Sequence, residues 1–407
     1  MQTDECKPRL WVLTELYHPE LTSTGYFLTR IAESLASHLE VNVICSQPTY
    51  ASRGVRVPPV ETRNGVHITR CRGTRFDKDF LPLRLLNIIS ITLSIFIKAL
   101  VSIRRGEVVL AVTNPPALPF AAAIACWIRG ARFFLLVHDV YPDALVCAGL
   151  LHRGSPLVWL IGRFEALIYS SANRIVVIGR DMKELLETRV GRAGSKIVVI
   201  RNWADSEFVQ PAARESNRLL MEIGLLDKFV IQYSGNIGRT HGIEHLVDCS
   251  QRFTEQAGVH FLFIGFGGKK EWLAGRIKEG TLNNATLIDY LPRSDLPVSL
   301  NACDIAVISF CDGMAGVSVP SRMYNIMAAG KPIIALTDTC SELARVISEE
   351  NIGWVVAPGD VSALCEIIKK TKGYPGLLAD MGRRARKAAE AKYSLDRVKR
   401  AYLDLIS

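Results

Sequence analysis

The stretch GMAGVSVPSRMYNIMAAGKPIIAL, residues 313–336, decides the fold. A glycine-rich loop leads into a small-residue helix and then into the apolar strand 333–336, an order typical of α/β sheets. We expect the Ser321 hydroxyl to cap the helix. The free N–H groups of the helix start and the Arg322 guanidinium predict an anion site, suited to phosphate. An ordinary strand connection with a capping serine and a surface arginine would give the same pattern.

Length and composition indicate a globular chain with two domains. The chain has 407 residues, 49% of them apolar and 22% charged, which allows a sizeable core in each half. Ten cysteines are scattered without a C-x-x-C pair, which predicts buried thiols in a reducing compartment and no structural zinc. The polar N-terminus up to Arg9 gives no sign of a signal peptide.

Strand-like apolar runs alternate with helical segments in both halves, which predicts parallel, doubly wound sheets. The first half has predicted helices at 25–39 and 119–129 and predicted strands at 9–14, 41–46, 108–113, 133–138, 174–178 and 197–201. The second half has predicted strands at 229–234, 260–264, 285–288, 305–309, 333–336 and 353–356. The polar stretch 205–217 is the expected linker, and 377–406 reads as a basic amphipathic helix pair. We therefore predict domains at 1–205 and 218–385, with a final helix at 386–407.

The net charge of +9 is concentrated in residues 51–105, where eleven Lys and Arg face three acids. Such a block implies an anionic partner: nucleic acid, lipid headgroups or a phosphorylated substrate. The apolar run 87–103 lies between Arg84 and Arg104, and Lys98 interrupts it, so it is a poor transmembrane span. A helix on an anionic membrane and a buried helix of the first domain both fit this segment. We expect residues 80–105 to face a membrane.

PSRMYNIMAAGKPII (320–334) resembles the donor-binding helix segment of the retaining GT-B glycosyltransferases of family 4, above all their bacterial surface-polysaccharide branch. The resemblance implies a GT-B fold: two Rossmann-like doubly wound domains facing a cleft. It also implies that the final helix crosses back to the first domain near Tyr393-Ser394. In this family the helix start holds the diphosphate of a nucleotide sugar.

The resemblance also implies which residues of the second domain bind the donor. They lie in the glycine turn 234–242, in a second turn after the strand at 260–264, and around the helix start: Gly235, Asn236, Gly238, Arg239, His241, Gly265, Gly267, Val319, Ser321, Arg322 and Asn325. The chain departs from the family where Asn236 and His241 replace an arginine and a lysine. Val317 and Asn325 replace two glutamates, so the backbone amides of 316–322 are expected to hold most of the donor.

First-domain candidates follow from the motif LVHDVYPD (136–143) and from the loop 15–25. His138 and Asp139 follow a buried strand, and the resemblance implies that His138 contacts the donor sugar and Asp139 orients His138 or meets the acceptor. Gly25 resembles the end of the family's glycine-rich loop. Residues 292–296 with Asp304 resemble the segment that cups the nucleobase. Residues 77–79 have the letters of a D-x-D metal motif but read as a solvated turn, and the family needs no metal.

The resemblance implies a transferase of the hexosyl or N-acetylhexosaminyl type. Its expected donor is a nucleotide-diphosphate sugar, most simply a UDP-sugar, and its acceptor a polyprenyl-diphosphate-linked saccharide of bacterial lipopolysaccharide, capsule or exopolysaccharide. We expect no cofactor, no metal, no nucleic-acid partner and a peripheral or monotopic place on the cytoplasmic face of the inner membrane. A nucleotide-sugar 2-epimerase of the same fold and a degenerate partner subunit without turnover are the alternatives.

Overall fold

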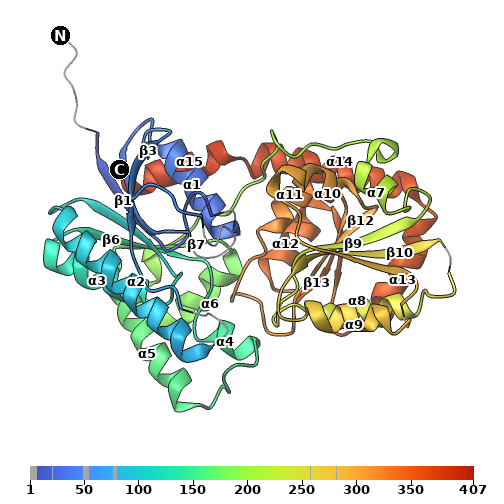
Figure 1. Cartoon of the computed structure of the whole chain (residues 1–407), viewed down its shortest axis with the longest axis horizontal. Helices are drawn as coiled ribbons and strands as arrows, with labels where there is room; N and C mark the ends of the chain where they lie inside the picture. The colour runs from blue at the N-terminus through green and yellow to red at the C-terminus, as the bar shows by residue number, and fades with distance from the viewer. Residues whose placement is uncertain (1–6, 21, 49–54, 77–79, 257, 281) are drawn as a thin grey trace, which may run out of the picture. The chain divides into compact units, whose positions relative to one another are not determined.

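The computed structural model describes residues 7–20, 22–48, 55–76, 80–256, 258–280 and 282–407. The chain forms two compact units. Unit 1 comprises residues 1–141, 154–201 and 398–407, and unit 2 comprises residues 142–153 and 202–397. Each unit is an α/β layer structure around one sheet (Figure 1). The nine cysteines among the described residues are free thiols.

Unit 1 contains an eight-stranded sheet of order β3-β4-β2-β1-β5-β6-β7-β8. Every pairing is parallel except the β3–β4 hairpin. The strands are β1 (Arg9–Leu13), β2 (Glu40–Ser46), β3 (Val60–Arg63), β4 (Val66–Cys71), β5 (Val108–Val112), β6 (Arg132–Val137), β7 (Arg174–Val177) and β8 (Ile197–Val199). The helices are α1 (Ser23–Leu35), α2 (Leu81–Ser102), α3 (Leu118–Arg129), α5 (Pro156–Ser171) and α6 (Arg180–Val190), followed by the 3-10 turn η1 (Gly191–Lys196).

Unit 2 contains a six-stranded, fully parallel sheet of order β11-β10-β9-β12-β13-β14. Its strands are β9 (Phe229–Asn236), β10 (Val259–Phe266), β11 (Ala285–Ile288), β12 (Ile305–Ser309), β13 (Ile333–Leu336) and β14 (Gly353–Val356). Its helices are α4 (Asp143–Cys147), α7 (Arg218–Glu222), α8 (Ile243–Gln251), α9 (Lys270–Lys278), α10 (Leu296–Asn301), α11 (Arg322–Ala328), α12 (Glu342–Glu350), α13 (Val361–Lys372) and α14 (Pro375–Lys392), with 3-10 turns η2 (Arg214–Ser216) and η3 (Arg293–Asp295). The core is apolar, with Phe261, Phe263 and Ile305 fully buried.

The predicted strands are present in both sheets, and the β3–β4 hairpin is the element that the sequence did not predict. β3 is short and largely exposed, and β4 has polar residues between its buried apolar ones, so neither gives the continuous apolar signal of a buried strand. The predicted bounds of the first helix, 25–39, were wrong. Thr22 caps it by accepting from the Gly25 N–H, so it begins at Ser23, and it ends at Leu35.

Two segments pack with the unit that is built mainly from the other half of the sequence. Residues 142–153, predicted in the first domain, pack with unit 2, where the Cys147 thiol donates to the Gly313 carbonyl at 3.3 Å. The chain passes from α14 to α15 (Leu395–Ile406), and residues 398–407 belong to unit 1. There Arg132 Nη2 donates to the Ile406 carbonyl at 3.2 Å, and Tyr402 is buried. The expected return of the last helix to the first domain is therefore present.

Candidate functional site

The carboxyl edge of the unit 2 sheet carries two glycine turns, one after β9 and one after β10. Gly235 has a φ of 144°, and a Cβ there would lie 2.6 Å from Arg322 Cζ. Gly267 has a φ of 146°, and its Cβ would lie 2.5 Å from the Ile237 carbonyl oxygen. Only glycine allows both this backbone conformation and these close approaches. The turns therefore pack on each other and on the arginine side chain.

Arg322, at the start of α11, is fixed over the first turn by three contacts. Nη1 donates to the Ser234 carbonyl at 3.2 Å and Nη2 donates to His241 Nε2 at 3.0 Å. The guanidinium carbon lies 4.9 Å from the centroid of the Tyr233 ring, within cation–π range. The structure thus brings together Gly235, His241 and Arg322, which the sequence placed in one anion site.

His241 is buried, and it stays neutral at physiological pH. Burial, with Arg322 and Lys269 adding to the effect, lowers its pKa to about 3. Because Arg322 is always a donor, Nε2 must accept and the ring proton must lie on Nδ1, 3.4 Å from Thr240 Oγ1. His241 therefore serves as a neutral support for the cations beside it.

Lys269 is a second cation at this edge, and sequence reasoning missed it. Its Nζ donates to the His241 carbonyl at 3.1 Å and lies 2.7 Å from Glu244 Oε1. A Lys-Lys pair after the β10 turn was the available signal, but only the packing of the two turns shows which lysine faces His241. Arg239 is exposed, and its guanidinium makes no bond to another described residue. Arg239, Lys269 and Arg322 bring three cations to this edge, where Glu244 pairs with Lys269.

The helix start differs from its prediction. α11 has seven residues, and the Ser321 hydroxyl makes no capping hydrogen bond, because Ser321 itself has helical dihedral angles (φ −60°, ψ −22°). The Val317 N–H donates to the Met314 carbonyl at 3.0 Å, so this amide of the 316–322 loop is engaged within the loop. Anion binding here must therefore depend on the side-chain cations more than the sequence predicted.

Five other predicted positions lie close to this edge or pack within unit 2. Asn236 is exposed in the first turn, where Gly238 lies so close that a Cβ would be 2.8 Å from Asn236 Nδ2. Val319 is buried. Asn325 is buried, and its Oδ1 accepts from the Asp205 N–H at 3.1 Å, so this oxygen holds the 202–205 segment. Gly265, with a φ of 150°, ends β10 beside Gly235.

The interpretation of Asp304 as a nucleobase contact is wrong. Its Oδ2 accepts from Arg214 Nη1 at 2.9 Å and from the Val230 N–H at 2.7 Å. Val230 lies at the start of β9 and Asp304 directly precedes β12, so this contact is at the amino edge of the sheet. The glycine turns lie at the opposite edge, because parallel strands place all their carboxyl ends together. In the same 292–296 segment Arg293 pairs with Asp205 at 3.3 Å.

In unit 1, His138 and Asp139 directly follow β6 at the carboxyl edge of the sheet. The His138 N–H donates to Thr113 Oγ1 at 3.1 Å. Its Nε2 is buried and has no partner among the described residues. Burial lowers the pKa of His138 to about 4, so the ring is neutral at physiological pH. A buried ring nitrogen without a partner is the feature that a bound ligand would explain.

The resemblance placed Gly25 at the end of a glycine-rich loop, but the structure places it in the first turn of α1. A Cβ at Gly25 would lie 2.7 Å from the Glu20 carbonyl oxygen, so glycine lets the 15–20 loop fold against the helix. The motif at 77–79 lies outside the described residues. Among the described residues, no three His, Cys, Asp or Glu side chains gather as candidate metal ligands.

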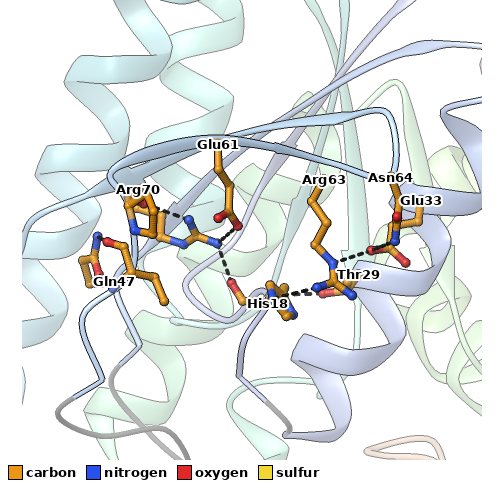
Figure 2. A network of polar contacts seen from close by, with 10 residues as sticks. His18, Thr29, Glu33, Gln47, Glu61, Arg63, Asn64 and Arg70 are labelled. Atoms are coloured by element: carbon orange, nitrogen blue, oxygen red, sulfur yellow. Dashed lines mark hydrogen bonds and ion pairs between the residues drawn. The ribbon is translucent and has the colours of Figure 1, made fainter.

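The 15–20 loop of unit 1 is held by an arginine that the sequence analysis did not single out. Arg70, on β4, has a fully buried side chain. Its Nη2 donates to the His18 carbonyl at 2.9 Å and to Glu61 Oε1 at 2.6 Å, and Nη1 donates to the Pro58 carbonyl at 2.9 Å (Figure 2). The hairpin thus fixes the backbone of the loop.

A second arginine of the hairpin fixes the His18 ring. Arg63 Nη1 donates to His18 Nε2 at 2.9 Å, and Nε donates to Glu33 Oε1 at 2.9 Å (Figure 2). Asn64 donates to the same Glu33 oxygen, and the His18 N–H donates to Thr29 Oγ1. Burial and then Arg63 lower the pKa of His18. The contacts of the hairpin therefore fix the loop that follows β1 at the carboxyl edge of the unit 1 sheet.

Family models match both halves of the chain. "Glycosyl transferase 4-like domain" matches residues 24–203, and "Glycosyl transferases group 1" matches residues 221–388. The probable glycosyltransferase WbjE of Pseudomonas aeruginosa is 34% identical over 88% of this chain and 88% of its own length. The chain belongs to the family 4-like glycosyltransferases.

Further similarities agree with this family. The glycosyltransferase is 26% identical to the putative colanic acid biosynthesis glycosyl transferase WcaI of Escherichia coli, over 95% of this chain and 97% of WcaI. The crystal structure of Anabaena Alr3699/HepE in complex with UDP-glucose matches with a TM-score of 0.74 at 15% identity, over 98% of this chain and 99% of that one. That similarity establishes the fold alone. The glycosyltransferase thus has the predicted GT-B fold.

Proposed function

We propose that this glycosyltransferase moves a sugar from a UDP-sugar to a polyprenyl-diphosphate-linked saccharide, with retention of configuration, in bacterial surface-polysaccharide biosynthesis. The positive carboxyl edge of unit 2 carries the proposal. Arg322 and Lys269 are both fixed on a neutral His241, so they need little reorganisation to meet a diphosphate. The name of WcaI supports a role in polysaccharide biosynthesis, and the UDP-glucose complex of Alr3699/HepE supports the donor class.

In the proposed reaction the bond between the anomeric carbon and the diphosphate oxygen breaks, and an acceptor hydroxyl forms the new bond from the same face. The acceptor proton passes to the departing diphosphate. Arg322, Lys269 and the exposed Arg239 would neutralise the charge that develops on this leaving group. In this proposal the cations neutralise the leaving group as a metal ion does in other enzymes, so no metal is required.

His138 is proposed to hydrogen-bond a hydroxyl of the transferred sugar. Its neutral ring and its unpartnered, buried Nε2 suit this contact better than a role as a charged acid. Asp139, the next residue, is proposed to meet the acceptor or to orient His138. The reaction would take place at the cytoplasmic face of the inner membrane, where lipid-linked saccharides are exposed to nucleotide sugars.

A transfer screen tests the proposal. UDP-, GDP- and dTDP-sugars are offered with a synthetic polyprenyl-diphosphate-linked saccharide, with and without EDTA, and products are analysed for anomeric configuration. We expect transfer from a UDP-sugar, EDTA resistance and a retained configuration. Transfer from GDP-sugars alone would overturn the donor assignment. Tight UDP binding without any turnover would favour a non-catalytic partner subunit.

A further inference from the structure

Helix α2 has two apolar faces, and only one of them packs inside unit 1. Ile91, Ile95 and Ala99 are buried against the sheet. The opposite face exposes a stripe of apolar side chains at helical spacing: Leu85, Leu86, Ile89, Leu93, Ile97 and Val101, each about half exposed or more. Residues 82–102 have a mean hydropathy of 2.0 and meet the length and composition of a membrane span. Because one face is committed to the sheet, the other is presented outward along the side of the unit.

The exposed apolar surface continues onto α3 and α5, which the sequence did not connect with a membrane. Figure 1 shows α2, α3 and α5 side by side on unit 1. Phe120 of α3 and Phe164 of α5, both exposed, meet edge to face with ring centroids 5.9 Å apart. Trp127 is 84% exposed and Trp159 is 68% exposed. Monomeric soluble proteins seldom leave such a contiguous surface uncovered.

The exposed charge on these three helices is entirely positive. Arg84, Arg129 and Arg163 are exposed, and Lys98 is half-buried. Glu165 is the single acidic residue in the three helices, and its side chain is buried. Apolar side chains among cations fit a bilayer that contains anionic lipids.

We propose that the exposed faces of α2, α3 and α5 form one membrane-docking face for an anionic bilayer, with Trp127 and Trp159 as anchors in the headgroup layer. Tryptophan prefers that layer because its ring is amphipathic. A symmetric contact between two copies would place the same cations against each other, so it fits the charge less well. The inference deepens the proposed function, because it gives the enzyme a defined lipid surface next to a lipid-linked acceptor.

Vesicle co-sedimentation tests the docking face. The full chain is mixed with phosphatidylethanolamine–phosphatidylglycerol vesicles or with phosphatidylcholine vesicles. We expect strong binding to the first and weak binding to the second. Trp127→Glu combined with Trp159→Glu should lower binding to anionic vesicles at least tenfold, and Arg84→Gln combined with Arg163→Gln should remove the preference for anionic lipid. Tyr374→Glu, at a 64% exposed aromatic of unit 2, is the matched control and should bind like the wild type.

Circular dichroism and thermal unfolding check that each variant is folded, because the substituted tryptophans and arginines lie in unit 1. Unchanged vesicle binding of the double tryptophan variant would overturn the proposal, as would a dimer of the wild type that this variant dissociates. Brominated lipids should quench the tryptophan fluorescence of the wild type, and an absence of quenching would also count against the anchors. Failure of sugar transfer with intact vesicle binding would refute the proposed function and leave the docking face standing.

Discussion

At the residue scale, one neutral histidine organises the cations of the candidate donor site. Arg322 donates to the His241 ring and Lys269 donates to its carbonyl, so two positive groups are held close together without a carboxylate between them. Glu244 pairs with Lys269 and offsets part of this charge. Repulsion between these cations destabilises the empty protein, and a bound diphosphate would compensate their charge.

Arg322→Met and Lys269→Met should each weaken UDP binding by about ten- to a hundredfold, because each removes a charge-assisted contact worth about 1.5–3 kcal/mol. Isothermal titration with UDP measures the effect. Arg383→Met removes an exposed arginine from α14 and should bind UDP like the wild type. Equal affinities for all three variants would refute the assignment of the cations.

The low pKa of His241 makes stability depend on pH. The unfolded chain binds a proton at this residue below about pH 6.5, whereas the folded chain does so only near pH 3. The contribution of His241 to the free energy of unfolding is therefore fully present above about pH 6.5. It falls on acidification, by about 1.4 kcal/mol per pH unit at most. His241→Gln keeps an acceptor for Arg322 and should reduce the slope of this dependence in thermal unfolding between pH 6.5 and 4.5, while the buried His138, whose pKa is also lowered, keeps its own contribution. His67→Gln, at an exposed histidine, should leave it unchanged.

At the element scale, the β3–β4 hairpin acts as a clamp on the loop that follows β1. Arg70 holds the His18 carbonyl and Arg63 holds the His18 ring, while Glu33 of α1 binds Arg63 from the other side. β3 is a short, exposed strand, and β4 carries polar residues, among them the buried Arg70, between its apolar ones. This explains why a pattern of hydrophobicity did not reveal them.

Arg70→Met should loosen the loop at residues 15–20. It leaves the buried His18 carbonyl and Glu61 without a donor, at a cost of about 1–3 kcal/mol. Hydrogen–deuterium exchange of that loop should become faster, with little change in unit 2. Arg72→Met, at an exposed arginine just after β4, is the matched control. Unaltered exchange in the Arg70 variant would show that the hairpin does not hold the loop.

At the scale of the whole molecule, the chain does not divide at a single point. Residues 142–153 belong to unit 2 and residues 398–407 to unit 1, so each unit is completed by a segment from the other part of the sequence. The last segment contributes buried side chains, among them Tyr402 and Ile406. The stability of unit 1 should therefore depend on the end of the chain.

Tyr402→Ala should destabilise unit 1 by about 3–5 kcal/mol, because it leaves a cavity where an aromatic ring is fully buried. Limited proteolysis should then cut within residues 7–201 while UDP binding by unit 2 persists. Asp404→Ala, at an exposed position of the same helix, should behave like the wild type. Simultaneous loss of both units would contradict this assignment of the last helix.

The sequence by itself determined the two parallel sheets, because buried strands and their glycine turns leave strong local patterns. The family resemblance placed Gly235, His241 and Arg322 in one donor site, and the structure brings these three residues together. Where prediction relied on a local motif alone, it was less successful. Ser321 does not cap α11, and Asp304 lies at the opposite edge.

Only the tertiary structure decided which side chains meet from distant segments. Lys269 joins the donor site because two glycine turns pack together, and Arg70 reaches His18 because an unpredicted hairpin lies beside β2. The sequence also left open whether the helix at 87–103 is buried or lies on a membrane. The structure shows that α2 is packed on one side and exposed on the other. Local patterns record burial and backbone conformation, whereas long-range contacts depend on how the strands and turns are arranged in space.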